Sequence, residues 1–188
     1  AYDPNGGISN TTELEVQASV GTNTPQKIAI ATGQDPTTQV GFAWESSLDV
    51  TTGEVRIASR PNMDNYQVYP ASASETPFKF NNQTMLANMW GAHVEDLVPG
   101  TTYYYQVGTG EIFSEVKAFT TAKAGLRATF AVYGDLQGKF EEFPHTRAQL
   151  ENLYPNADIK LIAGDISDSG DQFSNWSLID THVGESFG

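Results

Sequence analysis

The sequence predicts an all-β sandwich followed by an α/β segment, because its apolar pattern changes partway along the chain. Up to about Thr121, short runs rich in Val, Thr, Tyr and Phe alternate with Gly, Pro, Asn and Asp clusters, as in strands joined by turns. After the linker at 122–125, continuous apolar runs flank a helical pattern, as in parallel strands with a crossover helix. We therefore expect two domains, residues 1–121 and 126–188.

The composition excludes several classes of function. With 10 Lys and Arg against 23 Asp and Glu, the net charge is −13, so we expect no nucleic-acid binding through a basic patch. The absence of Cys excludes disulfides, thiolate metal sites and a Cys nucleophile. No apolar run approaches the roughly 20 residues of a membrane-spanning helix. The start at Ala1 lacks a Met and a signal-like apolar region, so we expect a mature or trimmed N-terminus and a protein that is secreted or at the cell surface.

The first domain is expected to contain enough short strands for a β-sandwich. Gly- and Pro-containing turns such as Thr52-Gly53 and Pro99-Gly100 separate them. The expected strands are Leu14–Val20, Lys27–Ala31, Val40–Trp44, Glu54–Ala58, Tyr66–Tyr69, Met85–Glu95, Thr102–Gly108 and Glu115–Thr120.

A local motif near the end of this domain indicates its topology. A turn at Pro99-Gly100 leads into a strand that begins with Tyr103, whose hydroxyl can reach back to the preceding corner as in the tyrosine corner of Greek-key sandwiches. Alternation places Tyr103, Tyr105 and Val107 on one face. An edge hairpin with aromatic residues is the alternative. The first domain resembles a fibronectin type III domain.

The second segment predicts a βαβ unit followed by another helix. Residues 129–133 and 159–163 are continuous apolar runs, which are typical of strands buried on both faces. Between them, the pattern from Pro144 to Tyr154 predicts an amphipathic helix. Beyond the second strand, apolar residues recur every three or four positions from Phe173 to Val183, which predicts a second helix. The apolar face of the first helix is expected to comprise Ala148, Leu150, Leu153 and Tyr154.

Both predicted parallel strands end in Gly-Asp, at Asp135 and Asp165. In open α/β sheets, ligands bind beyond the carboxyl ends of the strands, and adjacent strands are about 4.8 Å apart. Two carboxylates there could share a metal pair. A single Gly-Asp is commonly turn chemistry, with Asp capping the next helix. Two on consecutive strands, the second continuing as Gly-Asp-x-x-Asp to Asp168, favour a metal site.

These motifs resemble those of the calcineurin-like metallophosphoesterase superfamily, whose first two metal motifs end adjacent strands. Joined to a fibronectin-like domain that carries Leu-x-Pro-Gly-Thr-x-Tyr-Tyr-Tyr, they resemble the purple acid phosphatase branch. The resemblance implies an enzyme that hydrolyses phosphate mono- or diesters at a centre of two divalent or trivalent ions, such as Fe, Zn or Mn. Asp135 would bind the first ion, and Asp165 would bridge both.

The sequence departs from the family pattern at several points. Gln137 stands where the superfamily commonly has His, and is expected to be a turn residue, a support for a ligand or a weak ligand. Asp168 occupies the position of the purple acid phosphatase Tyr, so no purple chromophore is expected. The resemblance gives Asp168 the role of orienting a catalytic His, with direct metal ligation as the alternative.

The later His motifs of the family are missing from this sequence, and His93, His145 and His182 do not replace them. We therefore expect an N-terminal fragment of the catalytic domain that is inactive alone, holds no complete catalytic set and partners the remainder of that domain. The alternative function is a noncatalytic, fibronectin-like interaction or adhesion module.

Overall fold

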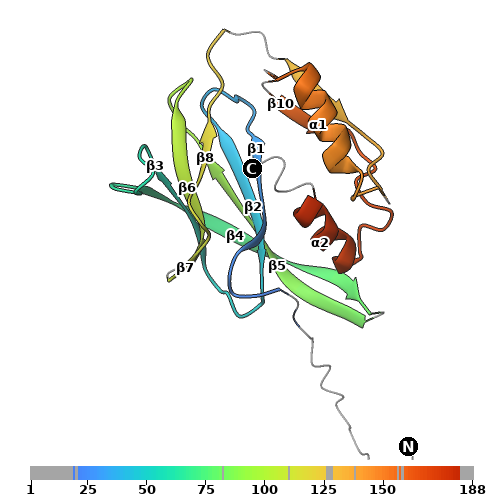
Figure 1. Ribbon diagram of the computed structural model, residues 1–188. Helices are drawn as coiled ribbons and strands as arrows, with labels where there is room; N and C mark the ends of the chain where they lie inside the picture. The colour runs from blue at the N-terminus through green and yellow to red at the C-terminus, as the bar shows by residue number, and fades with distance from the viewer. Residues whose placement is uncertain are drawn as a thin grey trace, which may run out of the picture.

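The computed structural model describes Ser19 and residues 21–81, 83–109, 111–125, 129–137, 139–155, 157 and 159–182. A β-sandwich comes first, and a smaller α/β unit lies beside it (Figure 1). The strand expected over Leu14–Val20 falls outside the described residues except for Ser19, which forms an isolated bridge with Leu86. Within the described residues, no helix has the length and apolar character needed to cross a membrane.

The described part of the sandwich contains eight antiparallel strands, and β4 connects its two halves. The first part of β4 pairs with β3, whereas its second part, from Ser72, pairs with β5. One half therefore has the order β1-β2-β5-β4, and the other comprises β3, β6, β7 and β8. The strands are β1 (Gln26–Thr32), β2 (Val40–Ser46), β3 (Gly53–Ala58), β4 (Gln67–Phe80), β5 (Gln83–Val94), β6 (Thr102–Thr109), β7 (Ile112–Phe113) and β8 (Lys117–Thr120).

The core of the sandwich lies between these halves and is rich in aromatic side chains. Trp44 of β2 stacks against Trp90 of β5 with 6.0 Å between ring centroids, and Phe42 packs on Tyr105 of β6 at 5.0 Å. A Cβ atom on Gly53 would lie 2.4 Å from the Trp90 ring, so only glycine allows this approach. The other buried members of the cluster are Val40, Val50, Val55, Ile57, Val94, Leu97 and Val107.

The tyrosine corner is confirmed. The Tyr103 hydroxyl accepts a hydrogen bond of 2.9 Å from the backbone N–H of Val98. Tyr105 and Val107 are buried, and Tyr103 packs against the same core, so the three share one face as the alternation predicted.

The prediction for the middle of the sandwich was wrong in extent. The expected short strand Tyr66–Tyr69 is part of β4, which continues to Phe80. Pro70, Pro77 and the polar residues between them resemble a loop, because proline cannot donate a ladder hydrogen bond. Tertiary pairing with β5 nevertheless holds this stretch in a strand.

The smaller unit has the predicted βαβ order. Strands β9 (Phe130–Tyr133) and β10 (Ile159–Ile162) pair in parallel, and helix α1 (Phe143–Leu153) connects them. Helix α2 (Phe173–His182) follows. A small core comprises Ala131, Tyr133, Leu136, Phe140, Phe143 and Ile179.

Two predictions about burial in this unit were wrong. The strands are not buried on both faces, because Phe130, Val132 and Leu161 are 54%, 56% and 44% exposed. They lie in register on one side of the two strands, and the helix covers only the other side. Leu153 and Tyr154 at the end of α1 are also exposed, whereas Leu150 packs against the small core.

Candidate metal centre

The candidate centre lies where the two parallel strands end together. Tyr133 of β9 is in register with Ile162 of β10, and the Ala163 N–H donates to the Tyr133 carbonyl over 2.7 Å. The pairing thus extends one residue past β10. Asp135 follows β9 by two residues and Asp165 follows β10 by three, so the two loops leave the same edge of the sheet.

Both aspartates have a left-handed backbone. Their φ angles are 54° for Asp135 and 49° for Asp165, and Gly164 has a φ of 101°. This conformation costs a residue with a side chain about 1 kcal/mol or more. Aspartate tolerates it better than most residues, and two neighbouring strands end with the same reversal. The paired loops thus turn sharply at the two carboxylates.

Gln137 links the two loops. Its backbone N–H donates to the Asp165 carbonyl over 2.9 Å, and its side-chain Nε2 donates to Asp165 Oδ2 over 3.2 Å. The second bond orients the carboxylate of Asp165. The Gln137 Oε1 atom is buried and has no hydrogen-bond partner among the described residues. A buried acceptor of this kind costs free energy unless a donor or a cation meets it.

The chemistry of these groups fits a hard cation in part. Two carboxylates and one amide oxygen are the ligand types that Mg²⁺, Mn²⁺ and related ions accept. Asp135, Asp165 and Asp168 are all exposed, so an ion could reach them. Within the described ranges, however, no group of three or more His, Asp or Glu side chains has a metal-binding arrangement. The described residues therefore supply part of a centre.

A charged cluster on α1 and β10 supports the strand that carries Asp165. Glu151 Oε1 lies 2.7 Å from Lys160 Nζ and 3.4 Å from Arg147 Nε. The hydrogen bond from Lys160 holds the pKa of Glu151 below its ordinary value. Burial raises the pKa of Tyr133, which stacks edge-to-face on Phe143 at 5.2 Å. These contacts fix β9 and β10 against α1.

The three histidines lie in the elements expected for them. His93 is on β5, where Nε2 contacts Glu95 Oε1 at 3.1 Å. His145 lies in the first turn of α1, and His182 is the last residue of α2. The structure brings Gln137 to Asp165, whereas Asp168 lies further along the exposed loop. The sequence does not predict the contacts between the end of this loop and the sandwich, since no local motif marks them.

The first part of the chain matches a known family. A family model described as purple acid phosphatase, N-terminal domain, matches residues 25–121, just over half of the chain. A search of curated proteins found no match.

A solved structure of a purple acid phosphatase has a similar fold. Purple acid phosphatase PPD1 from yellow lupin (Lupinus luteus) seeds superposes with a TM-score of 0.64 and 14% identity, over 88% of this chain and 33% of the lupin chain. A structure of PhoD has a TM-score of 0.49 and 16% identity, over 76% of this chain and 28% of that chain. The chain thus spans about a third of the lupin protein, and the likeness shows the fold.

Proposed function

The chain belongs to the family of purple acid phosphatase N-terminal domains, and from this premise we propose that it is the N-terminal portion of a metal-dependent phosphoesterase. The substrate class is a phosphate mono- or diester. Residues 1–121 form the fibronectin type III-like domain, 122–125 the linker, and 126–188 the first part of the calcineurin-like catalytic domain. The parent enzyme would act outside the cell or at its surface, as the resemblance implies.

The observation that carries the proposal is the pair of aspartates at the ends of β9 and β10. Asp135 and Asp165 have matching left-handed backbones at the edge of a parallel sheet where ligands of α/β folds bind. Glycine would adopt these φ angles without strain, but both positions carry an aspartate side chain. Strained residues of this kind concentrate at functional sites.

Each residue of the site has a separate proposed role. Asp135 would hold the first ion, and Asp165 would bridge two ions. Gln137 keeps the Asp165 carboxylate in one orientation through its Nε2 bond, and its own buried Oε1 is available to a cation or to a donor on a ligand. When bound, the two ions would supply an activated water and neutralise charge on the phosphoryl oxygens. Asp168 would orient a further ligand.

The exposed face of β9 and β10 supports a larger parent domain. Phe130, Val132 and Leu161 form an apolar row on strands that run in register. Parallel strands usually have both faces covered. We propose that the remainder of the catalytic domain covers this row and supplies the remaining metal ligands.

The test is the change Asp165→Asn in the parent enzyme with the whole catalytic domain. The amide keeps the size of the side chain but removes the charge that would bridge two ions. Since loss of a supporting partner costs about 10–100-fold in metal affinity or activity, loss of this ligand should reduce phosphoester hydrolysis by more than about 100-fold.

Asp49→Asn is the matched control, because Asp49 is an exposed aspartate in a sandwich turn. It should leave hydrolysis unchanged. Near wild-type hydrolysis by Asp165→Asn would reject the metal assignment. A parent protein without metal-dependent hydrolysis would favour the noncatalytic interaction module instead.

A further inference from the structure

The loop that leaves Asp165 ends on the sandwich. After Ser169 and Gly170, the carbonyl of Asp171 accepts a hydrogen bond of 2.6 Å from the Lys79 N–H of β4, and Gln172 forms a parallel bridge with Lys79. The side chains meet as well, with Lys79 Nζ 2.7 Å from Asp171 Oδ2. The loop thus adds one bridge to the edge of β4.

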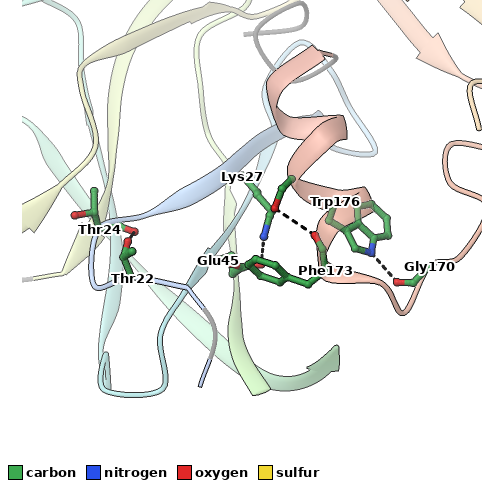
Figure 2. A network of polar contacts seen from close by, with 8 residues as sticks. Thr22, Thr24, Lys27, Glu45, Gly170, Phe173 and Trp176 are labelled. Carbon is green, nitrogen blue, oxygen red and sulfur yellow. Dashed lines mark hydrogen bonds and ion pairs between the residues drawn. The ribbon is translucent and has the colours of Figure 1, made fainter. Parts of the chain in front are cut away.

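The next residue, Phe173, enters an aromatic site on the sandwich. Its ring packs edge-to-face against Phe78 and Phe80 of β4, each at 5.9 Å between centroids. Lys27 Nζ of β1 lies 3.7 Å from the centroid of the Phe173 ring. Figure 2 shows Lys27 between Glu45 and Phe173, at the point where α2 begins. The first residue of α2 therefore contacts two strands of the other unit.

Lys27 is held in place for this contact. Its φ is 50°, and the β1–β2 register shifts between Gln26 and Ala29, as at a bulge that turns a side chain in a new direction. Its Nζ lies 2.6 Å from Glu45 Oε2, and the Glu45 side chain is fully buried. A buried carboxylate needs such a partner. Lys27 pairs with the Oε2 atom of Glu45 and at the same time presents its charge to the Phe173 ring.

Trp176 of α2 also holds the loop that follows Asp165. Its Nε1 donates to the Gly170 carbonyl over 2.6 Å (Figure 2), and its ring packs with Phe78 and Ala87 of the sandwich. Asn175 Nδ2 also donates to Ser167 Oγ over 3.2 Å. The loop after Asp165 is therefore fixed at its far end by α2 and β4, and at its near end by β10.

We propose that Phe173 and Lys79 are positioning residues through which the sandwich holds residues 165–172 in their observed path. One consequence rests on the proposed function: by holding this loop, the sandwich would set the positions of Asp165 and Asp168 in the metal site. The holding contacts themselves are independent of any metal. We call Lys27, Phe78, Phe80, Lys79, Asp171 and Phe173 the latch.

The two parts of the latch should contribute unequally. Lys79 and Asp171 are about half exposed, 56% and 49% for their side chains, and exposed ion pairs contribute little. Phe173 combines two aromatic contacts with a cation–π contact to Lys27, whose side chain is only 13% exposed. Removing the ring should therefore release the loop far more than removing the Lys79 charge.

Hydrogen–deuterium exchange on the 188-residue chain measures the holding directly. Phe173→Ala should raise the exchange of amides in residues 165–172 about tenfold or more, as expected for easier local opening. Exchange in β2 and β5 should stay as in the wild type. Leu178→Ala is the matched control, since Leu178 is an exposed apolar residue of the same helix. Unchanged loop exchange in Phe173→Ala, or an equal rise in Leu178→Ala, would overturn the proposal.

Two variants of Lys79 test the proposal even if Phe173→Ala unfolds the whole α/β unit. Lys79→Met should give a smaller rise in loop exchange, and Lys79→Arg should restore the wild-type rate because it returns the charge to Asp171. Equal loop exchange in the wild type and Lys79→Met would overturn the role of Lys79.

Metal dependence in the parent enzyme separates this inference from the proposed function. Phe173→Leu should raise the Mn²⁺ concentration that gives half-maximal hydrolysis by several-fold, with activity recovered at saturating Mn²⁺. Asp165→Asn should not recover. A faster loop exchange with unaltered Mn²⁺ dependence would overturn the link from latch to metal, while activity retained by Asp165→Asn would reject the metal site and leave the exchange result standing.

Discussion

The sandwich and the α/β unit differ in how completely they bury their apolar residues. In the sandwich, Trp44, Val55 and Val107 are at most 1% exposed, and they lie between the two halves of the sheet. In the α/β unit, Phe143 is equally buried, but one face of its strands exposes Phe130 and Val132. The main core of the sandwich lies within the sandwich, whereas the second region relies on contacts beyond itself.

The difference explains where each unit finds its stability. The α/β unit has a small core and adds contacts to the sandwich through Phe173 and Trp176. Small domains gain little from their own cores, because a large share of their surface stays exposed. The sandwich therefore serves as the support on which the candidate metal centre is held.

The largest expected effect comes from Phe143→Ala. Loss of this buried ring from the smaller core should lower the free energy of unfolding of the α/β unit by about 3–5 kcal/mol. A unit with so small a core should not stay folded after such a loss. Exchange of amides in β9, α1 and β10 should approach that of the unfolded chain, while β2 and β5 stay protected.

Trp44→Ala is the matched change in the sandwich. It should lower the stability of the sandwich by a similar amount and loosen both units, because the α/β unit depends on the sandwich. The α/β unit should depend on the sandwich, but the sandwich should not depend on the α/β unit. Faster amide exchange in β2 and β5 of Phe143→Ala would contradict this expectation.

An intermediate effect is expected from Tyr103→Phe. The change removes the hydroxyl that accepts the Val98 N–H, but this amide is exposed, so water can replace the lost partner. The free energy of unfolding should fall by about 1 kcal/mol, as measured by urea denaturation. A loss above that of Trp44→Ala would show that the corner, and not the aromatic core, dominates the sandwich.

The smallest effect should come from the pH dependence of the Lys79–Asp171 pair. The hydrogen bond from Lys79 lowers the pKa of Asp171 from 3.8, and the same bond raises the pKa of Lys79 from 10.5. The pair should stabilise the chain fully between these two values. Its contribution should fall as the pH drops through the lowered pKa of Asp171, or rises through the raised pKa of Lys79.

Thermal melting of the wild type and of Lys79→Met checks this prediction. The difference in Tm should be present at neutral pH, smaller than that of Tyr103→Phe, and should vanish in strong acid. A difference that persists unchanged in strong acid would mean that Lys79 acts through packing and not through its charge.

Patterns within a few residues of each other predicted most of the fold. Alternation identified β2, β3 and β6, and the Pro99-Gly100 turn identified the tyrosine corner because all its atoms lie within one short segment. The βαβ order followed from two apolar runs around one helical pattern. The extent of β4 was missed, because pairing with β5 overrides the local preference of its prolines.

The candidate site was predictable only in its local part. Gly-Asp at the ends of two strands located Asp135 and Asp165, and adjacency of the strands followed from the βαβ order. Apolar composition alone could not reveal that one face of the strands is open, since a covered and an uncovered face carry the same residue types. The latch was missed because Lys27 and Phe173 are far apart in sequence, and only the folded chain brings them together.

We propose that Asp135 and Asp165 form the metal-binding part of this chain. The most direct measurement is Mn²⁺-induced broadening of backbone amide signals in the NMR spectrum of the 188-residue chain, compared with that of Asp165→Asn. We expect broadening centred on residues 134–137 and 164–166 in the wild type, and we expect it to be lost in the variant. Broadening spread over the acidic surface, as a net charge of −13 alone would give, and equal in both proteins would contradict it.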